Sequence, residues 1–172
     1  IEKMCVVADR GMISQDTIRQ MESKGMSYIL GVRMRRVNEV KTGVLTRAGR
    51  YKEIHPESDF SKAPSPLKIK QVMHNGKRYI VCLNPRQARK DEATRNAIIE
   101  GLKDKLKGGA KSLIGNKGYR KYLKISKDTV QIDPNKIKEE EQFDGKWVLT
   151  SNLDMSAEQI ALKYKELWMV EP

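Results

Sequence analysis

Hydrophobic residues in this chain occur in short runs that are separated by polar, turn-forming segments. Continuous apolar runs of this length, bounded by polar residues, are typical of strands buried on both faces of a sheet. Three runs fit the pattern and are predicted strands: 3–8, 27–32 and 146–151.

A helix is predicted between the first two strands. Ser14 is a typical N-cap residue, Ile18 and Met21 share one face, and Gly25 suits the position just past a helix end. The helix is therefore expected to run to about Lys24. A strand, a helix and a second strand of these lengths form a β-α-β unit, which indicates a mostly parallel sheet.

The middle of the chain predicts a hairpin followed by a long helix. Two alternating runs, 67–73 and 77–83, flank Asn75-Gly76, which is a strong hairpin signal. Asn84-Pro85 then places an N-cap residue before a proline at the first helical position. This helix is expected to end at about Lys107. Its apolar positions include Ala88, Ala97, Ile98, Leu102 and Leu106.

The last third predicts two short strands and a final helix. A basic segment ending at Ser126 is expected to finish in a strand that pairs with residues 129–132. Asp133-Pro134 then turns the chain into an acidic run. Ser156, followed three residues later by Gln159, forms a capping-box pattern that predicts the start of the last helix.

The two ends of the chain together predict one α/β layer, and the middle predicts an insertion. The fold class is therefore expected to be α/β, with a partial core at 1–33 and 144–172 and a mixed α+β insertion at 34–143 that contains the hairpin. The sequence begins inside a predicted strand and ends inside a predicted helix. We therefore expect it to be a piece of a longer protein.

The charge balance favours a polyanionic partner. The 172 residues include 34 Lys and Arg against 22 Asp and Glu, a net charge of +12. Nucleic acid is the first polyanion to consider, although a domain with many surface lysines has the same composition. No apolar stretch approaches the ~18 residues of a membrane span, and no secretory signal opens the chain. Cys5 and Cys82 lie in apolar runs, which predicts buried thiols in a cytoplasmic protein.

Two carboxylates are candidate metal ligands. Asp9 directly follows a predicted buried strand, where the metal-binding acids of phosphoryl-transfer folds tend to lie; capping of the next turn is the alternative. Glu171 shares one predicted helical face with residues seven, four and three positions before it: Tyr164, Leu167 and Trp168. A metal would satisfy a carboxylate on an apolar stripe, and a solvated helix end is the alternative.

Trp147 and Trp168 are candidate stacking platforms. Aromatic side chains beside basic residues suit stacking on an unpaired base. A tryptophan in a strand or on a helix stripe is more often part of a core, so each residue alone is open to both interpretations.

Two segments together resemble a known family. VVADRGMIS at 6–14 is similar to the segment that carries the second catalytic aspartate of DDE transposases from bacterial insertion sequences. DGKWVLTSNLDMSAEQIALKYKELWMVE at 144–171 is similar to the segment that carries their catalytic glutamate. There the family has a strand ending in Leu-x-Thr, a loop and a helix reading Tyr-x-x-Arg-x-x-x-Glu. Leu167 stands at the arginine position.

The resemblance implies an RNase H-like catalytic core with three metal-binding acids. Asp9 would be the second acid and Glu171 the third, and the first is expected on an upstream strand. The three acids would bind two divalent ions, Mg²⁺ or Mn²⁺. Many family members carry a β-rich insertion between the second acid and the glutamate, which matches the insertion expected at 34–143. Pro172 disfavours helical geometry at Glu171.

The resemblance also implies a set of DNA contacts. Trp147 falls where relatives place an aromatic residue that stacks on a flipped base, and Tyr164 and Trp168 match positions that line the same pocket. A basic face of the insertion would neutralise backbone phosphates. It comprises Arg33, Arg35, Arg36, Arg47 and Arg50, with Lys117, Arg120 and Lys121 as further candidates. The expected DNA-binding residues are Arg10, Arg33, Arg35, Arg36, Trp147, Tyr164 and Trp168.

The resulting hypothesis is a catalytic-domain fragment of an insertion-sequence transposase. The parent enzyme would perform metal-dependent phosphodiester cleavage and strand transfer, with transposon ends and target DNA as partners and a homo-oligomer as its active form. With two of three acids, the chain alone is expected to be inactive and to bind little or no metal. The alternative is a non-enzymatic, basic nucleic-acid-binding domain in which Asp9 and Glu171 are structural.

Overall fold

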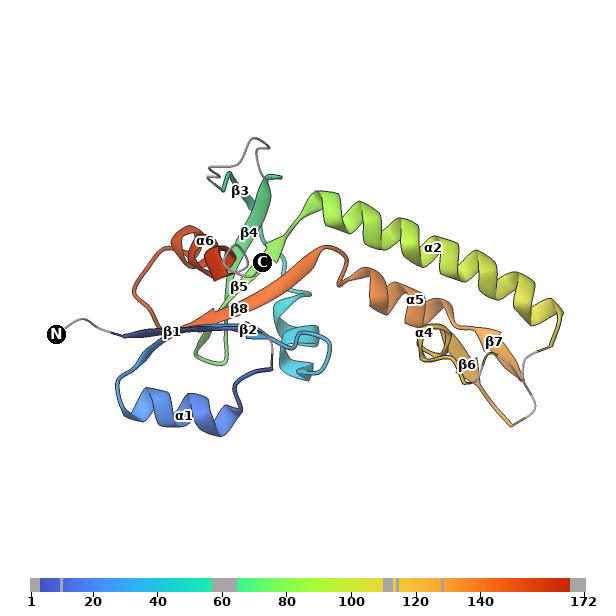
Figure 1. Ribbon diagram of the computed structural model, residues 1–172, viewed down its shortest axis with the longest axis horizontal. Coiled ribbons are helices and arrows are strands. Elements are labelled where there is room, and N and C mark those ends of the chain that lie inside the picture. The colour runs from blue at the N-terminus through green and yellow to red at the C-terminus, as the bar shows by residue number, and fades with distance from the viewer. Residues whose placement is uncertain are drawn as a thin grey trace. The chain divides into compact units, whose positions relative to one another are not determined.

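The computed structural model of the chain describes residues 4–9, 11–56, 65–109, 113, 115–127 and 129–167 (Figure 1). The chain divides into two compact units, residues 1–85 with 146–172 and residues 86–145. Each unit has its own sheet and its own hydrophobic cluster. The predicted division into a partial core at 1–33 and 144–172 and an insertion at 34–143 stays a prediction.

The first unit contains a six-stranded sheet in the order β1-β2-β8-β5-β4-β3. Its strands are β1 (Cys5–Ala8), β2 (Ser27–Val32), β3 (Lys52–Ile54), β4 (Leu67–His74), β5 (Lys77–Leu83) and β8 (Lys146–Ser151). β1 is parallel to β2, and all other neighbours are antiparallel. The expectation of a mostly parallel sheet is therefore wrong, because β8 and the β4–β5 hairpin extend the sheet beyond β2 with strands of alternating direction.

The three predicted strands lie side by side as β1, β2 and β8. β1 is an edge strand and its Cys5 is exposed, so the predicted burial of that thiol is wrong. β2 and β8 are distant in sequence, yet Ile29 lies opposite Ser151 and Val32 opposite Val148. The predicted hairpin also forms where expected. Its turn places Asn75-Gly76 at φ values of 49° and 72°, the left-handed conformation that the favoured two-residue turn requires.

Helices cover opposite faces of this sheet (Figure 1). α1 (Gln15–Ser23) packs through Met21 on a cluster that includes Leu30. α6 (Ala157–Leu167) packs on a second cluster that includes Ile29. Neighbouring residues of β2 therefore point to different helices, as the two-residue period of a strand requires.

Both helices begin at the predicted caps. Ser14 Oγ accepts a hydrogen bond of 3.1 Å from the backbone N–H of Thr17. Before α6, the Gln159 N–H donates to Ser156 Oγ at 3.1 Å, and the Ser156 N–H donates to Gln159 Oε1 at 3.0 Å. This reciprocal pair is the capping box that the sequence predicts, and it satisfies two N–H groups that a helix start leaves unpaired.

A short π-helix, η1 (Val40–Val44), lies between β2 and β3 and is not predicted by the sequence pattern. Val40 and Val44 are fully buried. A Cβ atom at Gly43 would come within 2.4 Å of the His74 ring, so a larger residue there would require this ring to move.

The second unit is built on one long helix. Its elements are α2 (Pro85–Lys107, which begins at the end of the first unit), α4 (Lys117–Arg120), β6 (Leu123–Ile125), β7 (Val130–Ile132) and α5 (Pro134–Glu141). α2 has the predicted bounds, and β6 pairs with β7 as expected. A cluster of Leu102, Leu113, Tyr122 and Leu123 packs these elements together.

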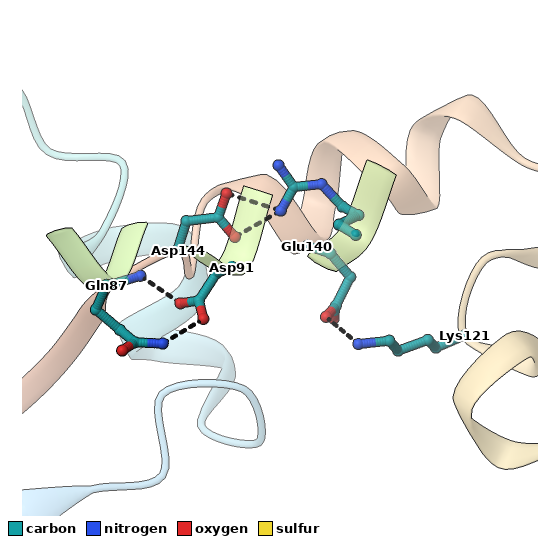
Figure 2. A network of polar contacts seen from close by, with 7 residues as sticks. Gln87, Asp91, Lys121, Glu140 and Asp144 are labelled. Carbon is teal, nitrogen blue, oxygen red and sulfur yellow. Dashed lines mark hydrogen bonds and ion pairs between the residues drawn. The ribbon is translucent and has the colours of Figure 1, made fainter. Parts of the chain in front are cut away.

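The apolar stripe of α2 differs from the expected one. Ala97 is exposed and Ile98 is only partly buried, whereas Ile99 and Arg95 are buried. Arg95 Nη1 donates to both carboxylate oxygens of Asp144, which is labelled in Figure 2, at 2.5 and 2.7 Å. A charge that is paired in this way can occupy a buried position.

A second carboxylate, that of Asp91 on α2, contacts the turn that contains Asp144. Asp91 accepts from Gln87 Nε2 at 2.7 Å and from the backbone N–H of Gly145 at 2.8 Å (Figure 2). Two acidic side chains, one on α2 and one in the turn, therefore attach α2 to the turn at Asp144-Gly145. Within the described part of the chain, no helix has the length and apolar character needed to cross a membrane.

Candidate active site

The predicted metal ligand Asp9 lies directly after β1, on the side of the sheet that α6 covers. Ala8 packs in the α1 cluster and Val7 packs against the α6 cluster, so the alternation of the strand directs Asp9 toward α6. The hydroxyl of Tyr164, on α6, donates to Asp9 Oδ1 at 2.7 Å. Tyr164 is only 3% exposed, and this bond brings together two residues that are 155 positions apart.

Arg78 on β5 holds the loop that leads into α6. Its guanidinium donates to the carbonyl oxygens of Leu153 and Met155, at 3.0 and 2.6 Å. These carbonyls belong to the loop between β8 and α6. Sequence reasoning did not identify Arg78, since no local pattern links it to a loop that lies 75 residues away.

Arg33 lies at the carboxyl end of β2, beside the loop that follows Asp9. β1 and β2 are parallel, so their carboxyl ends meet at one edge of the sheet, where open α/β sheets usually bind ligands. Arg33 Nη2 donates to the carbonyl oxygen of Gly11 at 2.9 Å. Gly11 has a φ of +82°, and a Cβ atom there would lie 2.0 Å from the Arg33 side chain, so glycine allows this close approach.

The residues that follow β2 form a surface pocket. It has a volume of about 340 Å³ and is lined by Arg33, Met34, Arg35 and Arg36. Met34 is buried, whereas the three arginines are exposed. An exposed pocket with three guanidinium groups is suited to an anionic ligand such as a phosphate, because guanidinium geometry matches phosphate oxygens.

Trp147 lies on β8 and is partly buried against the α6 cluster. It is paired in register with Cys82, a fully buried member of that cluster. Trp147 and Tyr164 therefore contact the same hydrophobic cluster, on the same face of the sheet. The packing of Trp147 is a structural role, and its exposed part is compatible with the predicted role in stacking.

The structure thus brings together some of the predicted site residues. Asp9 contacts Tyr164, and Arg33 contacts the loop after Asp9. Three predicted residues lie outside the described residues: Arg10, Trp168 and Glu171. The side chain of Leu167, at the family's arginine position, is also outside the description.

Asp9 is chemically suited to bind a divalent metal ion, because hard cations such as Mg²⁺ prefer carboxylate oxygens. Across the described ranges, no group of three or more His, Cys, Asp or Glu side chains could hold a metal ion. The predicted second ligand of this chain, Glu171, is not part of those ranges. Asp9 thus fits a metal site in kind.

A comparison with protein families gave one result that bears on this geometry. The family model described as "Transposase DDE domain" matches residues 3–172, which include both segments that meet at the Asp9–Tyr164 bond. Searches of curated proteins and of solved structures each found no match.

Proposed function

The chain belongs to the DDE transposase domain family, and on this premise we propose that it forms part of a catalytic domain that cleaves and joins DNA at the ends of an insertion sequence. The family predicted from the sequence is confirmed over residues 3–172. Its members are transposases, which are enzymes that act on DNA with divalent metal ions. The six-stranded mixed sheet is consistent with an RNase H-like fold.

The observation that carries the proposal is the hydrogen bond from Tyr164 to Asp9. It connects the helix of one family motif to the strand end of the other. Glu171 follows Tyr164 by seven residues in sequence. We propose that Asp9 and Glu171 are the second and third catalytic acids, and that an acid upstream of residue 1 completes the set.

The proposed mechanism assigns separate tasks to the residues of this chain. When bound, two divalent ions would activate the attacking oxygen and stabilise the leaving oxygen. Asp9 and Glu171 would bind these ions through their carboxylates. The Tyr164 hydroxyl would fix the orientation of the Asp9 carboxylate, because its hydrogen bond to Oδ1 restricts rotation of that group.

DNA would be positioned by cations near the same edge of the sheet. Arg33, Arg35 and Arg36 surround the pocket at the end of β2, and we propose that they neutralise backbone phosphates. Arg10 and Trp168 remain proposed DNA contacts on the basis of the family resemblance alone. Binding through phosphates should depend strongly on salt and weakly on base sequence.

The test is a cleavage assay on a duplex that carries the element's end. The protein, extended in its reading frame by the upstream segment, should cut this DNA with Mg²⁺ or Mn²⁺ and lose activity when the metal is chelated. The 172-residue chain alone should bind DNA without cutting it. Cleavage that persists in chelator would contradict the proposal. DNA binding by the extended protein without any cleavage would favour the non-enzymatic alternative.

Replacing Trp147 by Ala in the extended protein should impair end processing more than overall DNA binding. A single stacking contact is worth ~1–3 kcal/mol, which is a small part of the binding energy of many phosphate contacts. Cleavage rate and DNA affinity should be measured together with the thermal midpoint, because Trp147 also packs against the core. Trp147→Phe is the matched control, since it retains an aromatic ring. Equal losses of cleavage, binding and stability would show that Trp147 acts only as a core residue.

A further inference from the structure

The second unit carries a concentrated positive charge that the proposed active site does not use. Residues 105–127 contain eight Lys and Arg and no Asp or Glu. The acids of this unit lie instead on either side of that segment, for example at Asp104 and in the run 139–141. Such segregation creates a local field far stronger than the average charge of the chain implies.

Part of this charge is held in place by tyrosines. Lys105 Nζ donates to the Tyr119 hydroxyl at 2.8 Å and lies 4.6 Å from the centre of its ring. Lys121 Nζ lies 4.8 Å from the centre of the Tyr122 ring and forms an ion pair of 3.2 Å with Glu140. These contacts fasten α4 to α2, and the link between α4 and β6 to α5.

Four other cations stay exposed: Lys117, Arg120, Lys124 and Lys127. Within the described ranges, the structure gives none of them an ion-pair partner. We call these four residues the α4–β6 surface.

The four cations project from a packed base. Lys117 and Arg120 are three residues apart on α4 and therefore share one side of it, while Tyr119 packs into the hydrophobic cluster. On β6, Leu123 is buried and the next residue, Lys124, is exposed opposite Gln131 of β7, which is also exposed. The α4–β6 surface thus lies on the outside of a small core, and its charges are pre-positioned rather than attached to a free tail.

We propose that the α4–β6 surface of the second unit binds the phosphate backbone of duplex DNA. Duplex DNA carries one negative charge per about 1.7 Å of its axis, so it can engage several clustered cations at once. The nearby tyrosines do not present open ring faces, because Tyr122 is 2% exposed and lysines cover both rings. The surface therefore offers charge rather than stacking, which suits a duplex better than a single strand. The proposal rests on the proposed function only in its choice of DNA.

The test compares two triple variants of the 172-residue chain that remove equal charge. One carries Lys117→Gln, Arg120→Gln and Lys124→Gln on the α4–β6 surface. The control carries Arg89→Gln, Lys90→Gln and Lys138→Gln, which are exposed cations elsewhere in the same unit. Affinity for a 25-base-pair duplex of unrelated sequence is measured from low to high salt, and thermal unfolding checks that both variants fold.

We expect the slope of log K against log salt concentration to be smaller in magnitude by about 2–3 in the α4–β6 variant. Each lost phosphate contact removes about 0.9 from the magnitude of this slope. The control should change the slope by less than about 1. Equal changes in both variants would show an effect of net charge and overturn the proposal. An unchanged duplex affinity with weaker binding to single-stranded RNA would also overturn it. The result does not depend on whether Asp9 and Glu171 are catalytic acids. A failure of the proposed function can therefore be distinguished from a failure of the proposed DNA-binding surface.

Discussion

Asp9→Asn and Glu171→Gln should each abolish DNA-end cleavage by the protein that includes the upstream segment, while DNA binding is retained. Both substitutions keep the size of the side chain and remove the negative charge that a divalent ion requires. Metal ions contribute several kcal/mol to phosphoryl transfer. At about 1.4 kcal/mol for each factor of ten, the expected loss of rate is about a thousandfold or more.

Matched controls for these two variants lie in the same unit. Asp16→Asn on α1 and Glu166→Gln on α6 remove the same charge from exposed positions. Both controls should cleave at close to the wild-type rate, as measured by single-turnover kinetics. If Asp9→Asn and Glu171→Gln cleave as well as the controls do, the assignment of these two residues as catalytic acids is wrong.

Asp144→Ala should destabilise the chain by about 3–5 kcal/mol, the largest stability effect that we expect from a single change. The Arg95 residue is 5% exposed, and its guanidinium donates to both oxygens of Asp144. Removing the carboxylate leaves a buried cation without its partner. Chemical denaturation of wild type and variant measures the difference. Asp104→Ala, which breaks an exposed pair with Lys107, should change the free energy of unfolding by less than about 1 kcal/mol.

A double variant separates the loss of a partner from the loss of the pair. Arg95→Met together with Asp144→Leu removes both charges and should recover most of the stability lost in Asp144→Ala, because the desolvation of two ions is no longer required. A double variant that is as unstable as Asp144→Ala would mean that the hydrogen-bonded geometry of the turn, rather than the unpaired charge, controls stability.

Elements with local sequence signals could be predicted. The Asn75-Gly76 turn, the Ser156–Gln159 capping box and the long helix after Asn84 all depend on residues that are neighbours in sequence, and all three form as expected. α5 carries the same kind of start signal, since Asp133 accepts from the Asn135 N–H and Pro134 occupies the first turn. The sequence analysis predicts a turn and an acidic run there, and the structure shows a helix, Pro134–Glu141.

Features that depend on distant partners could not be predicted. The hydrophobic pattern of 67–83 predicts a hairpin, but it does not tell which sheet the hairpin extends, because register and neighbours are set by tertiary packing. The burial of Arg95 likewise depends on Asp144, 49 residues away. A charged residue in a helix is by default expected to face solvent.

The candidate site was predictable only through two motifs taken together. Asp9 alone is equally compatible with a turn cap, and the position of Glu171 alone favours a solvated helix end. Their order and spacing relative to the family motifs supplied the hypothesis. The contact between Tyr164 and Asp9 then adds a physical reason to place both motifs at one site.

The central claim is that Asp9 and Glu171 bind the same metal ions, and anomalous diffraction tests it most directly. Crystals of the extended protein, grown with a DNA end and Mn²⁺, would locate the metal independently of the protein density. We predict anomalous density at one site whose ligands include carboxylate oxygens of both Asp9 and Glu171. Carboxylates that lie on opposite faces of the sheet, or a peak coordinated by neither residue, would contradict the account.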